Sequence, residues 1–302
     1  MIDFIKLNNR LTSIEMQQLK NNIDFYGTYN TATGEEVSLS SNGKQVLNNI
    51  VAWEKNMKIK LYPSGWCEVS GSIHKYFNDG KHNFNQFEKS NLIESVSLLS
   101  DKLKVNLRNF KISGLEVGVN IKPPIDSQEI IANSLLYKSR PFESKYHNDE
   151  GNNKQVSLSE YRVKLYDKRL HYEVQGYEVG EETMRFEIKY NSMRSVKQKG
   201  IFLLEDLEQK IECLKEPLLN AWDKVLFFDP SINKKKNNEK NIRYTNINYW
   251  MELKKKITRT YNYHFNKQKK YTKENTCDIQ AQVRDIMMDT LDALVSVWVR
   301  ID

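Results

Sequence analysis

The chain has 302 residues and a net charge of +7, with 39% hydrophobic and 11% aromatic residues. This length allows one large domain or two modest ones, and the composition is that of a folded protein rather than a disordered one. No apolar run of about 18 residues occurs, so no membrane span is predicted. The three cysteines are scattered, and the first ten residues carry an acid and no long apolar core. A cytoplasmic protein without disulfides or a zinc site is therefore expected.

Residues 1–228 mix two kinds of hydrophobic pattern. Alternation of apolar and polar residues predicts strands at Lys58–Tyr62, Trp66–Tyr76, Gly114–Ile121, Glu160–Asp167 and Thr183–Tyr190. Helical spacing predicts helices at Ser13–Asn21, Asn83–Lys104, Ser127–Tyr137 and Leu203–Lys224. Runs of strand separated by single helices indicate an α+β domain, with a mainly antiparallel sheet and helices packed on one side. The segment 138–153 is expected to be a mobile loop. It either contacts DNA or is simply disordered.

Residues 229–302 form a second, helical region. Asp229-Pro230 and the polar run Ser231–Asn238 predict an exposed linker. Two helices are expected after it, at Asn248–Lys269 and Asp278–Val299.

The second region also holds most of the positive charge. Between Ser231 and Thr276 there are 13 Lys or Arg and three Glu, so this segment carries +10 and the remainder of the chain −3. Seven aromatic residues lie among these cations. The combination favours phosphate attraction and base stacking, and the alternative is a solvated helix surface. The candidate DNA-binding residues are Lys254, Lys255, Lys256, Arg259, Lys267, Lys269 and Lys270.

Four of the predicted strands each carry a polar set of side chains, because successive residues of a strand point to opposite faces. If the strands are neighbours, these sets share one face of the sheet, with Gly118 leaving room above it. The sets are Glu116 and Asn120; Arg185, Glu187 and Lys189; Arg162, Lys164, Tyr166 and Lys168; and Glu68, Ser70, Ser72 and His74.

Such a face suits phosphodiester chemistry. Carboxylates, with or without an imidazole, bind hard divalent ions such as Mg²⁺ or Mn²⁺, which polarise phosphate oxygens. A tyrosine hydroxyl beside lysines can attack phosphorus, while Lys164, Lys168 and Arg185 hold the phosphate. The alternative is an ordinary solvated face with surface ion pairs, a packing tyrosine and a hydrogen-bonded His74.

Several segments, in order, resemble a known protein family. They are Gly71–Phe87, Leu115–Ile121, Lys164–Lys168, Met184–Lys189 and Asn248–Trp250. They are similar to segments of the phage and plasmid replication proteins of the filamentous-phage gene II and gene X type, and the similarity spans roughly residues 66 to 270.

The resemblance implies a rolling-circle replication initiator in a bacterial host cell. Such an enzyme nicks one origin strand, stays linked to the 5′-phosphate through tyrosine, and later rejoins the strand. It implies Tyr166 as nucleophile, Glu116 and Glu187 as metal ligands with His74 as a possible third, and residues 1–228 as the nicking domain. Implied partners are origin DNA as duplex, hairpin or single strand, and a host helicase or polymerase.

The chain also departs from related initiators. It lacks a His-hydrophobe-His triplet, so carboxylates must carry the ion. Tyr161 and Tyr172 lie close enough in sequence to rival Tyr166 as nucleophile. A non-catalytic DNA-binding accessory protein or repressor is the alternative function. A tyrosine recombinase and an NTPase are disfavoured, because neither an Arg…His-x-x-Arg…Tyr arrangement nor a phosphate-binding Gly-Lys-Ser/Thr loop occurs.

Overall fold

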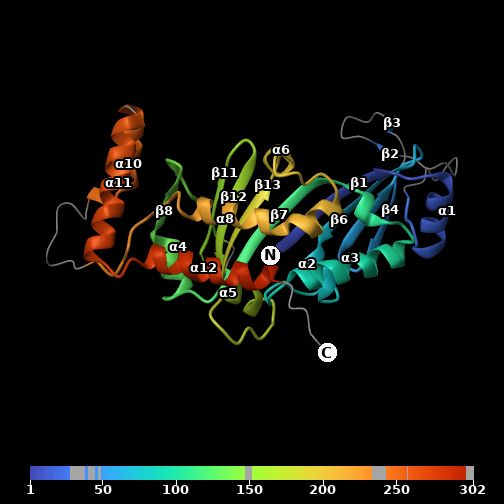
Figure 1. Ribbon diagram of the computed structural model, residues 1–302, viewed down its shortest axis with the longest axis horizontal. Helices are drawn as coiled ribbons and strands as arrows, with labels where there is room; N and C mark the ends of the chain where they lie inside the picture. The colour runs from blue at the N-terminus through green and yellow to red at the C-terminus, as the bar shows by residue number, and fades with distance from the viewer. Residues whose placement is uncertain are drawn as a thin grey trace. The chain divides into compact units, whose positions relative to one another are not determined.

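The computed structural model describes residues 1–27, 38–39, 45–46, 49–146, 152–232, 243–256 and 258–296. The predicted α+β class is confirmed: a nine-stranded antiparallel sheet is accompanied by helices, and a helical region ends the chain (Figure 1). Every helix in these ranges is too short or too polar to cross a lipid bilayer.

The main sheet has the strand order β10-β11-β12-β13-β7-β1-β6-β5-β4. Its strands are β1 (Ile2–Arg10), β4 (Ile50–Glu54), β5 (Met57–Leu61), β6 (Trp66–Ser72), β7 (Lys111–Ile121), β10 (Glu143–Tyr146), β11 (Asn152–Ser157), β12 (Tyr161–Asp167) and β13 (Met184–Tyr190). A three-stranded sheet contains β14 (Val225–Phe227), β8 (Ser134–Tyr137) and β9 (Arg140–Pro141), and β2 (Ser38–Leu39) pairs with β3 (Gln45–Val46).

The helices are mostly short and lie between the strands. They are α1 (Ser13–Asn22), α2 (Ile73–Phe77), α3 (Lys89–Leu103), α4 (Ser127–Asn133), α5 (Lys168–Glu173), α6 (Arg194–Lys197), α7 (Leu204–Lys210) and α8 (Lys215–Trp222). The C-terminal helices are α10 (Ile247–Lys256), α11 (Thr258–Asn275) and α12 (Ile279–Val295), and two 3₁₀ turns span Leu107–Asn109 and Ile211–Leu214.

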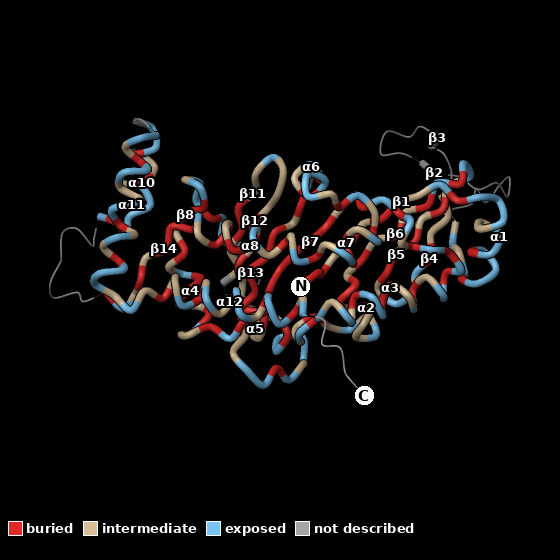
Figure 2. Tube along the Cα trace, in the orientation of Figure 1, coloured by how far each residue is buried: buried red, intermediate tan, exposed pale blue. Residues whose placement is uncertain are grey.

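By its internal contacts the chain divides into two compact units. The first contains Met1–Val117, Lys189–Leu214 and Leu294–Asp302, and the second contains Gly118–Ile188 and Lys215–Ala293. In the first unit α2 packs on β1 and β6, and α3 packs on α2. Along β5 buried and half-buried residues alternate, as a strand with one apolar face requires (Figure 2). In the second unit α4 packs on β11 and β12.

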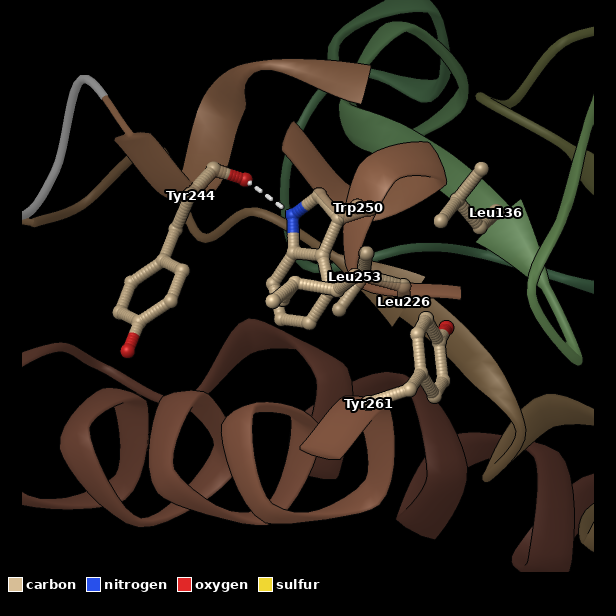
Figure 3. Close-up of a cluster of buried hydrophobic side chains, with 6 residues drawn as sticks. All are labelled: Leu136, Leu226, Tyr244, Trp250, Leu253 and Tyr261. Atoms are coloured by element: carbon tan, nitrogen blue, oxygen red, sulfur yellow. Dashed lines mark hydrogen bonds between the residues drawn. The ribbon is translucent and has the colours of Figure 1, made fainter. Parts of the chain in front are cut away.

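The second unit has a cluster of buried side chains of its own, drawn in Figure 3. Trp250 is completely buried, and its indole N–H donates a hydrogen bond to the Tyr244 carbonyl at 2.9 Å. These aromatic residues of the basic segment therefore build a core, whereas Tyr263 is 60% exposed. The cluster consists of Leu136, Leu226, Tyr244, Trp250, Leu253 and Tyr261.

Several predicted boundaries are wrong, for local reasons. The strand predicted at Trp66–Tyr76 ends at Ser72, whose side chain accepts a hydrogen bond from the Lys75 N–H and starts α2. The helix predicted at Ser127–Tyr137 ends at Asn133, because the next four residues pair with β14 as strand β8. Long-range strand pairing overrides helical spacing there.

Other helices differ in extent. The helix predicted from Asn83 begins at Lys89, and the one predicted at Leu203–Lys224 is interrupted by a 3₁₀ turn. The pattern at Asn248–Lys269 forms the two helices α10 and α11. The predicted loop at 138–153 instead contributes β9, β10 and the start of β11; residues 147–151 lie outside the described residues, as do residues 233–238 of the predicted linker.

Candidate metal centre and polar face of the sheet

Three of the strands with polar sets are adjacent, in the order β12-β13-β7, and β6 is separated from them by β1. Neighbouring strands lie about 4.8 Å apart, so side chains on one face of this group can contact each other. The sheet therefore brings the candidate residues on β7, β12 and β13 together. His74, which was expected at the end of the β6 strand, lies in α2 instead.

Three buried carboxylates form the candidate metal centre. Asp3, Glu116 and Glu187 each offer one oxygen, and these oxygens all lie within 4.8 Å of one another. The residues are 6%, 8% and 2% exposed. Carboxylate oxygens are the ligands that Mg²⁺ and Mn²⁺ prefer, so the donor set fits a hard divalent ion.

Sequence reasoning did not identify Asp3, because strand β1 was not predicted. Its signal was present: Ile5 and Leu7 alternate with Lys6 and Asn8, and the apolar pair is completely buried. The strand then pairs with both β6 and β7.

A β-bulge positions Asp3. Ile2 pairs with Val117 and Ile5 with Leu115, so Asp3 and Phe4 together lie opposite the single residue Glu116. A bulge of this kind redirects a side chain, and bulges are frequent beside functional sites. The pairing register thus explains why the Asp3 carboxylate on β1 lies beside the Glu116 carboxylate on β7.

Neutral donors orient the Asp3 carboxylate. The Ser72 hydroxyl donates to Oδ1 at 2.5 Å and the Asn83 amide donates to Oδ2 at 2.7 Å. Ser72 is the first residue before α2, so the start of that helix holds the carboxylate in place.

Three cations compensate the two glutamates. Lys164 Nζ lies 2.7 Å from Glu187 Oε1, Arg185 Nε lies 2.5 Å from Glu187 Oε2, and Lys189 Nζ lies 2.5 Å from Glu116 Oε1. The Lys164 and Lys189 side chains are 22% and 40% exposed, whereas Arg185 is 3% exposed. The two lysines can therefore give way to a bound cation by turning toward solvent, while Arg185 is fixed.

Arg185 is also held by the next strand. Its Nη1 donates a hydrogen bond to Asn120 Oδ1 at 2.8 Å. Gly118 lies between Glu116 and Asn120 on β7, and a Cβ there would lie 2.7 Å from Glu187 Cβ and 2.9 Å from Arg185 Nη2. A glycine is therefore needed for the Arg185–Glu187 pair to lie against β7.

Tyr166 lies on β12, next to the strand that carries Arg185 and Glu187. Its hydroxyl accepts a hydrogen bond from Lys168 Nζ at 3.2 Å, and Lys168 is 2% exposed. A cation held beside a phenol stabilises negative charge on its oxygen. Tyr166 itself is half-buried, so it is reachable from solvent.

The turn after Tyr166 is held by Asp167, which begins α5. Asp167 Oδ1 accepts from the Leu170 N–H, and Oδ2 accepts from the Gln128 amide, both at 2.8 Å. Burial raises the pKa of the Asp167 carboxyl despite these two hydrogen bonds. The Lys168 N–H donates to the Thr183 carbonyl at 2.8 Å, which fixes the start of the helix.

The rival tyrosines have different surroundings. Tyr172 is completely buried, so its hydroxyl cannot meet a DNA strand without movement of the fold. The Tyr161 hydroxyl lies 2.9 Å from the Tyr137 hydroxyl and accepts a hydrogen bond from Lys138 Nζ at 2.7 Å.

His74 is buried in a separate hydrogen-bonding group. Its Nε2 lies 2.8 Å from Asn85 Oδ1, and its ring stacks on Phe87 with centroids 4.6 Å apart. In the described part of the chain the carboxylate group contains Asp3 and does not include His74.

The candidate DNA-binding cations lie on α10 and α11. Lys254, Lys255, Arg259, Lys267 and Lys270 are exposed. Lys269 is half-buried, donates to the Asp223 carbonyl at 2.7 Å, and has a pKa lowered by burial. The side chain of Lys256 lies outside the described residues.

Comparisons with known proteins give little further information. No protein-family model and no curated protein matches the chain. One solved structure, described as "Structure of Rolling Circle Replication Initiator Protein from Geobacillus stearothermophilus", aligns with a TM-score of 0.40 and 11% identity. The alignment covers 80% of this chain and 89% of that one.

Proposed function

We propose that this chain is a DNA-nicking enzyme that starts rolling-circle replication, with Tyr166 as its nucleophile. The observation that supports this most is the group of three buried carboxylates, Asp3, Glu116 and Glu187, since Glu187 lies on the strand next to Tyr166. The sequence resemblance to phage and plasmid initiators includes the segments of Glu116, Tyr166 and Glu187, and Asp3 is a carboxylate that lies outside those segments.

In the proposed reaction the Tyr166 oxygen attacks the phosphorus of one phosphodiester. The bond between phosphorus and the 3′-oxygen breaks, which leaves a 5′-phosphotyrosine and a 3′-hydroxyl. The phenol proton passes to solvent, the departing 3′-oxygen takes a proton from solvent, and the Lys168 ammonium stabilises the phenolate oxygen. Strand rejoining is the reverse step, in which a 3′-hydroxyl attacks the phosphotyrosine and releases Tyr166.

The carboxylates hold a divalent cation in this proposal. Such an ion, when bound, polarises a non-bridging phosphate oxygen and stabilises charge that develops at phosphorus. Asp3, Glu116 and Glu187 would hold the ion, and Lys164 and Lys189, now paired with the two glutamates, would hold the phosphate. Arg185 stays in place and keeps the Glu187 carboxylate oriented through Oε2.

We also propose that residues 229–302 provide affinity for the DNA backbone. The exposed cations of α10 and α11 support this assignment, since phosphate contacts supply most sequence-independent affinity. The nicking domain is assigned to residues 1–228.

The proposal is tested by incubating the protein with Mn²⁺ and its cognate supercoiled plasmid or phage DNA. Wild type is expected to produce open circles that carry protein at the 5′ end. Tyr166→Phe should produce none, and Tyr161→Phe, the control, should nick like wild type. Nicking by Tyr166→Phe, or no nicking by wild type, contradicts the proposal.

A second candidate is a DNA-binding protein without catalysis. It is favoured by the ion pairs themselves, since Lys164, Arg185 and Lys189 already neutralise the two glutamates. The two candidates differ in their response to Asp3→Asn and Glu116→Gln. A nicking enzyme should lose Mn²⁺ binding and cleavage, whereas a binding protein should keep all its activity.

A further inference from the structure

A pocket of about 430 Å³ lies in the second unit, where α10 and α11 meet the β8–β9 turn. Three lysines contribute to its lining: Lys138 from the turn, Lys224 from the turn between α8 and β14, and Lys254 from α10. Among the residues that the structure describes, none with a carboxylate lines it. Its volume is within the range of small-molecule sites, and its charge indicates an anionic ligand.

In the described part of the chain, the lysines of the pocket form no ion pair with a carboxylate. Lys224 and Lys254 are exposed and form no ion pair with any residue that the structure describes. Lys138 Nζ donates to the Tyr161 hydroxyl, a neutral group, at 2.7 Å. Lysines from three segments line this cavity, and no carboxylate is among its described lining residues, so the lining suits a phosphate group.

The part of the pocket formed by α11 is aromatic. Tyr261 and Phe265 line it, one helical turn apart. Their rings are stacked, with centroids 6.1 Å apart and 17° between the planes. Tyr261 is held in the buried cluster beside Leu253 and Leu226 (Figure 3). Aromatic rings of this kind provide a surface on which a nucleobase stacks.

The turn at the rim of the pocket has a costly backbone conformation. Lys138 and Ser139 have φ angles of 45° and 62°, and they connect Tyr137 to its partner Arg140 as a two-residue hairpin turn. Turns with two positive φ angles favour Asn-Gly, and neither residue here is glycine. Such strained positions are frequent at ligand sites.

We propose that this pocket binds one nucleotide, with its phosphate held by Lys138, Lys224 and Lys254 and its base against Tyr261 and Phe265. The nucleotide is either an unpaired residue of a DNA strand or a free nucleoside phosphate. Binding of an unpaired residue of a DNA strand rests on the proposed DNA-binding function. It makes that function more specific, since the DNA must then be single-stranded.

The test measures binding of a fluorescent oligonucleotide of about 12 nucleotides, by anisotropy and in the presence of EDTA. The chain used carries Tyr166→Phe, so that the result is independent of nicking. Phe265→Leu keeps the apolar volume and removes the ring. The double variant Lys224→Ala/Lys254→Ala removes two pocket cations, and Lys267→Ala/Lys270→Ala is its control, with the same change in charge outside the pocket.

The ring variant is expected to bind single-stranded DNA roughly tenfold more weakly while duplex binding is unchanged. The pocket double variant should lose more affinity for the single strand than for duplex, whereas the control double variant should lose the same for both. Competition by dAMP indicates that free nucleotides enter the pocket, and its absence indicates a nucleotide of the strand; either result supports the proposal. Equal binding of an oligonucleotide whose sites are all abasic, or wild-type affinity in Phe265→Leu, overturns it.

Discussion

Two Glu–Lys pairs of this protein have the same length and opposite surroundings. Lys164–Glu187 in the sheet and Lys255–Glu252 on α10 both have an N–O distance of 2.7 Å. The Glu187 side chain is 2% exposed and the Glu252 side chain is 64% exposed. The first pair is part of a buried group with Arg185, while the second is screened by solvent.

The difference in exposure implies that the two pairs serve different purposes. Buried charges must be paired and oriented, so their geometry is fixed and can serve a reaction. Exposed charges cost little and keep their side-chain freedom, so they contribute affinity for a polyanion rather than geometry. We therefore expect substitutions in the sheet to change stability and chemistry, and substitutions on α10 and α11 to change DNA binding.

The largest effect on folding is expected from Glu187→Ala. This substitution removes the carboxylate that pairs with Arg185 and leaves the guanidinium buried without an acidic partner from Glu187, which lowers the free energy of unfolding by about 3–5 kcal/mol. Glu252→Ala, the control, should cost less than about 1 kcal/mol. Urea denaturation measures both. Equal losses of unfolding free energy in the two variants would contradict the difference between the buried pair and the exposed pair.

A smaller loss is expected from Gly118→Ala. The added Cβ would lie 2.7 Å from Glu187 Cβ and 3.0 Å from the Phe186 carbonyl oxygen, so a strand must shift at a cost of about 1–3 kcal/mol. Gly180→Ala is the control, since a Cβ there meets nothing within 4 Å. Thermal unfolding that leaves both variants at the wild-type midpoint would show that the face of β7 tolerates a side chain.

For the basic helices the expected effect is on salt dependence. Lys255→Ala/Lys270→Ala should lower the slope of log affinity against log salt by about 1.5 for DNA, since each lost phosphate contact contributes about 0.7–0.9. The unfolding midpoint should not change. An unchanged slope would mean that these exposed lysines do not contact DNA.

The smallest effect is the pH dependence contributed by Lys154 on β11. Burial lowers the pKa of its ammonium to about 8 in the folded chain, below the ordinary value of 10.5. The unfolded chain therefore binds more protons between these values, and folding stability from this group rises as pH increases from about 8 toward 10.5. The stability of wild type relative to Lys154→Met should increase from pH 7 to pH 9.5. A constant difference would contradict the burial of this charge.

The strands that carry the site were predicted well because alternation is a local property. Glu116, Tyr166 and Glu187 lie on strands β7, β12 and β13, whose positions follow from their own residues. The adjacency of these strands could only be assumed, because it depends on pairing between segments as far apart as β7 and β13.

Asp3 shows what local patterns do not provide. Its position depends on a bulge defined by the pairing of β1 with β7, and no residue near Asp3 in sequence specifies that register. His74 shows the reverse: it continues the alternation of β6, but the Ser72 cap turns the chain into a helix. Tyr244 and Trp250 likewise appear as stacking residues in sequence and lie in a core that tertiary contacts create.

The proposed function requires a covalent bond between Tyr166 and DNA. This bond can be detected by treating the protein with Mn²⁺ and cognate supercoiled DNA, digesting with nuclease and protease, and locating the nucleotide-modified peptide by mass spectrometry. We expect a nucleotide on the Tyr166 phenol oxygen through its 5′-phosphate, and none when Asp3→Asn or Glu116→Gln is used. A nucleotide on another residue, or a nicked product with no linked protein, would contradict it.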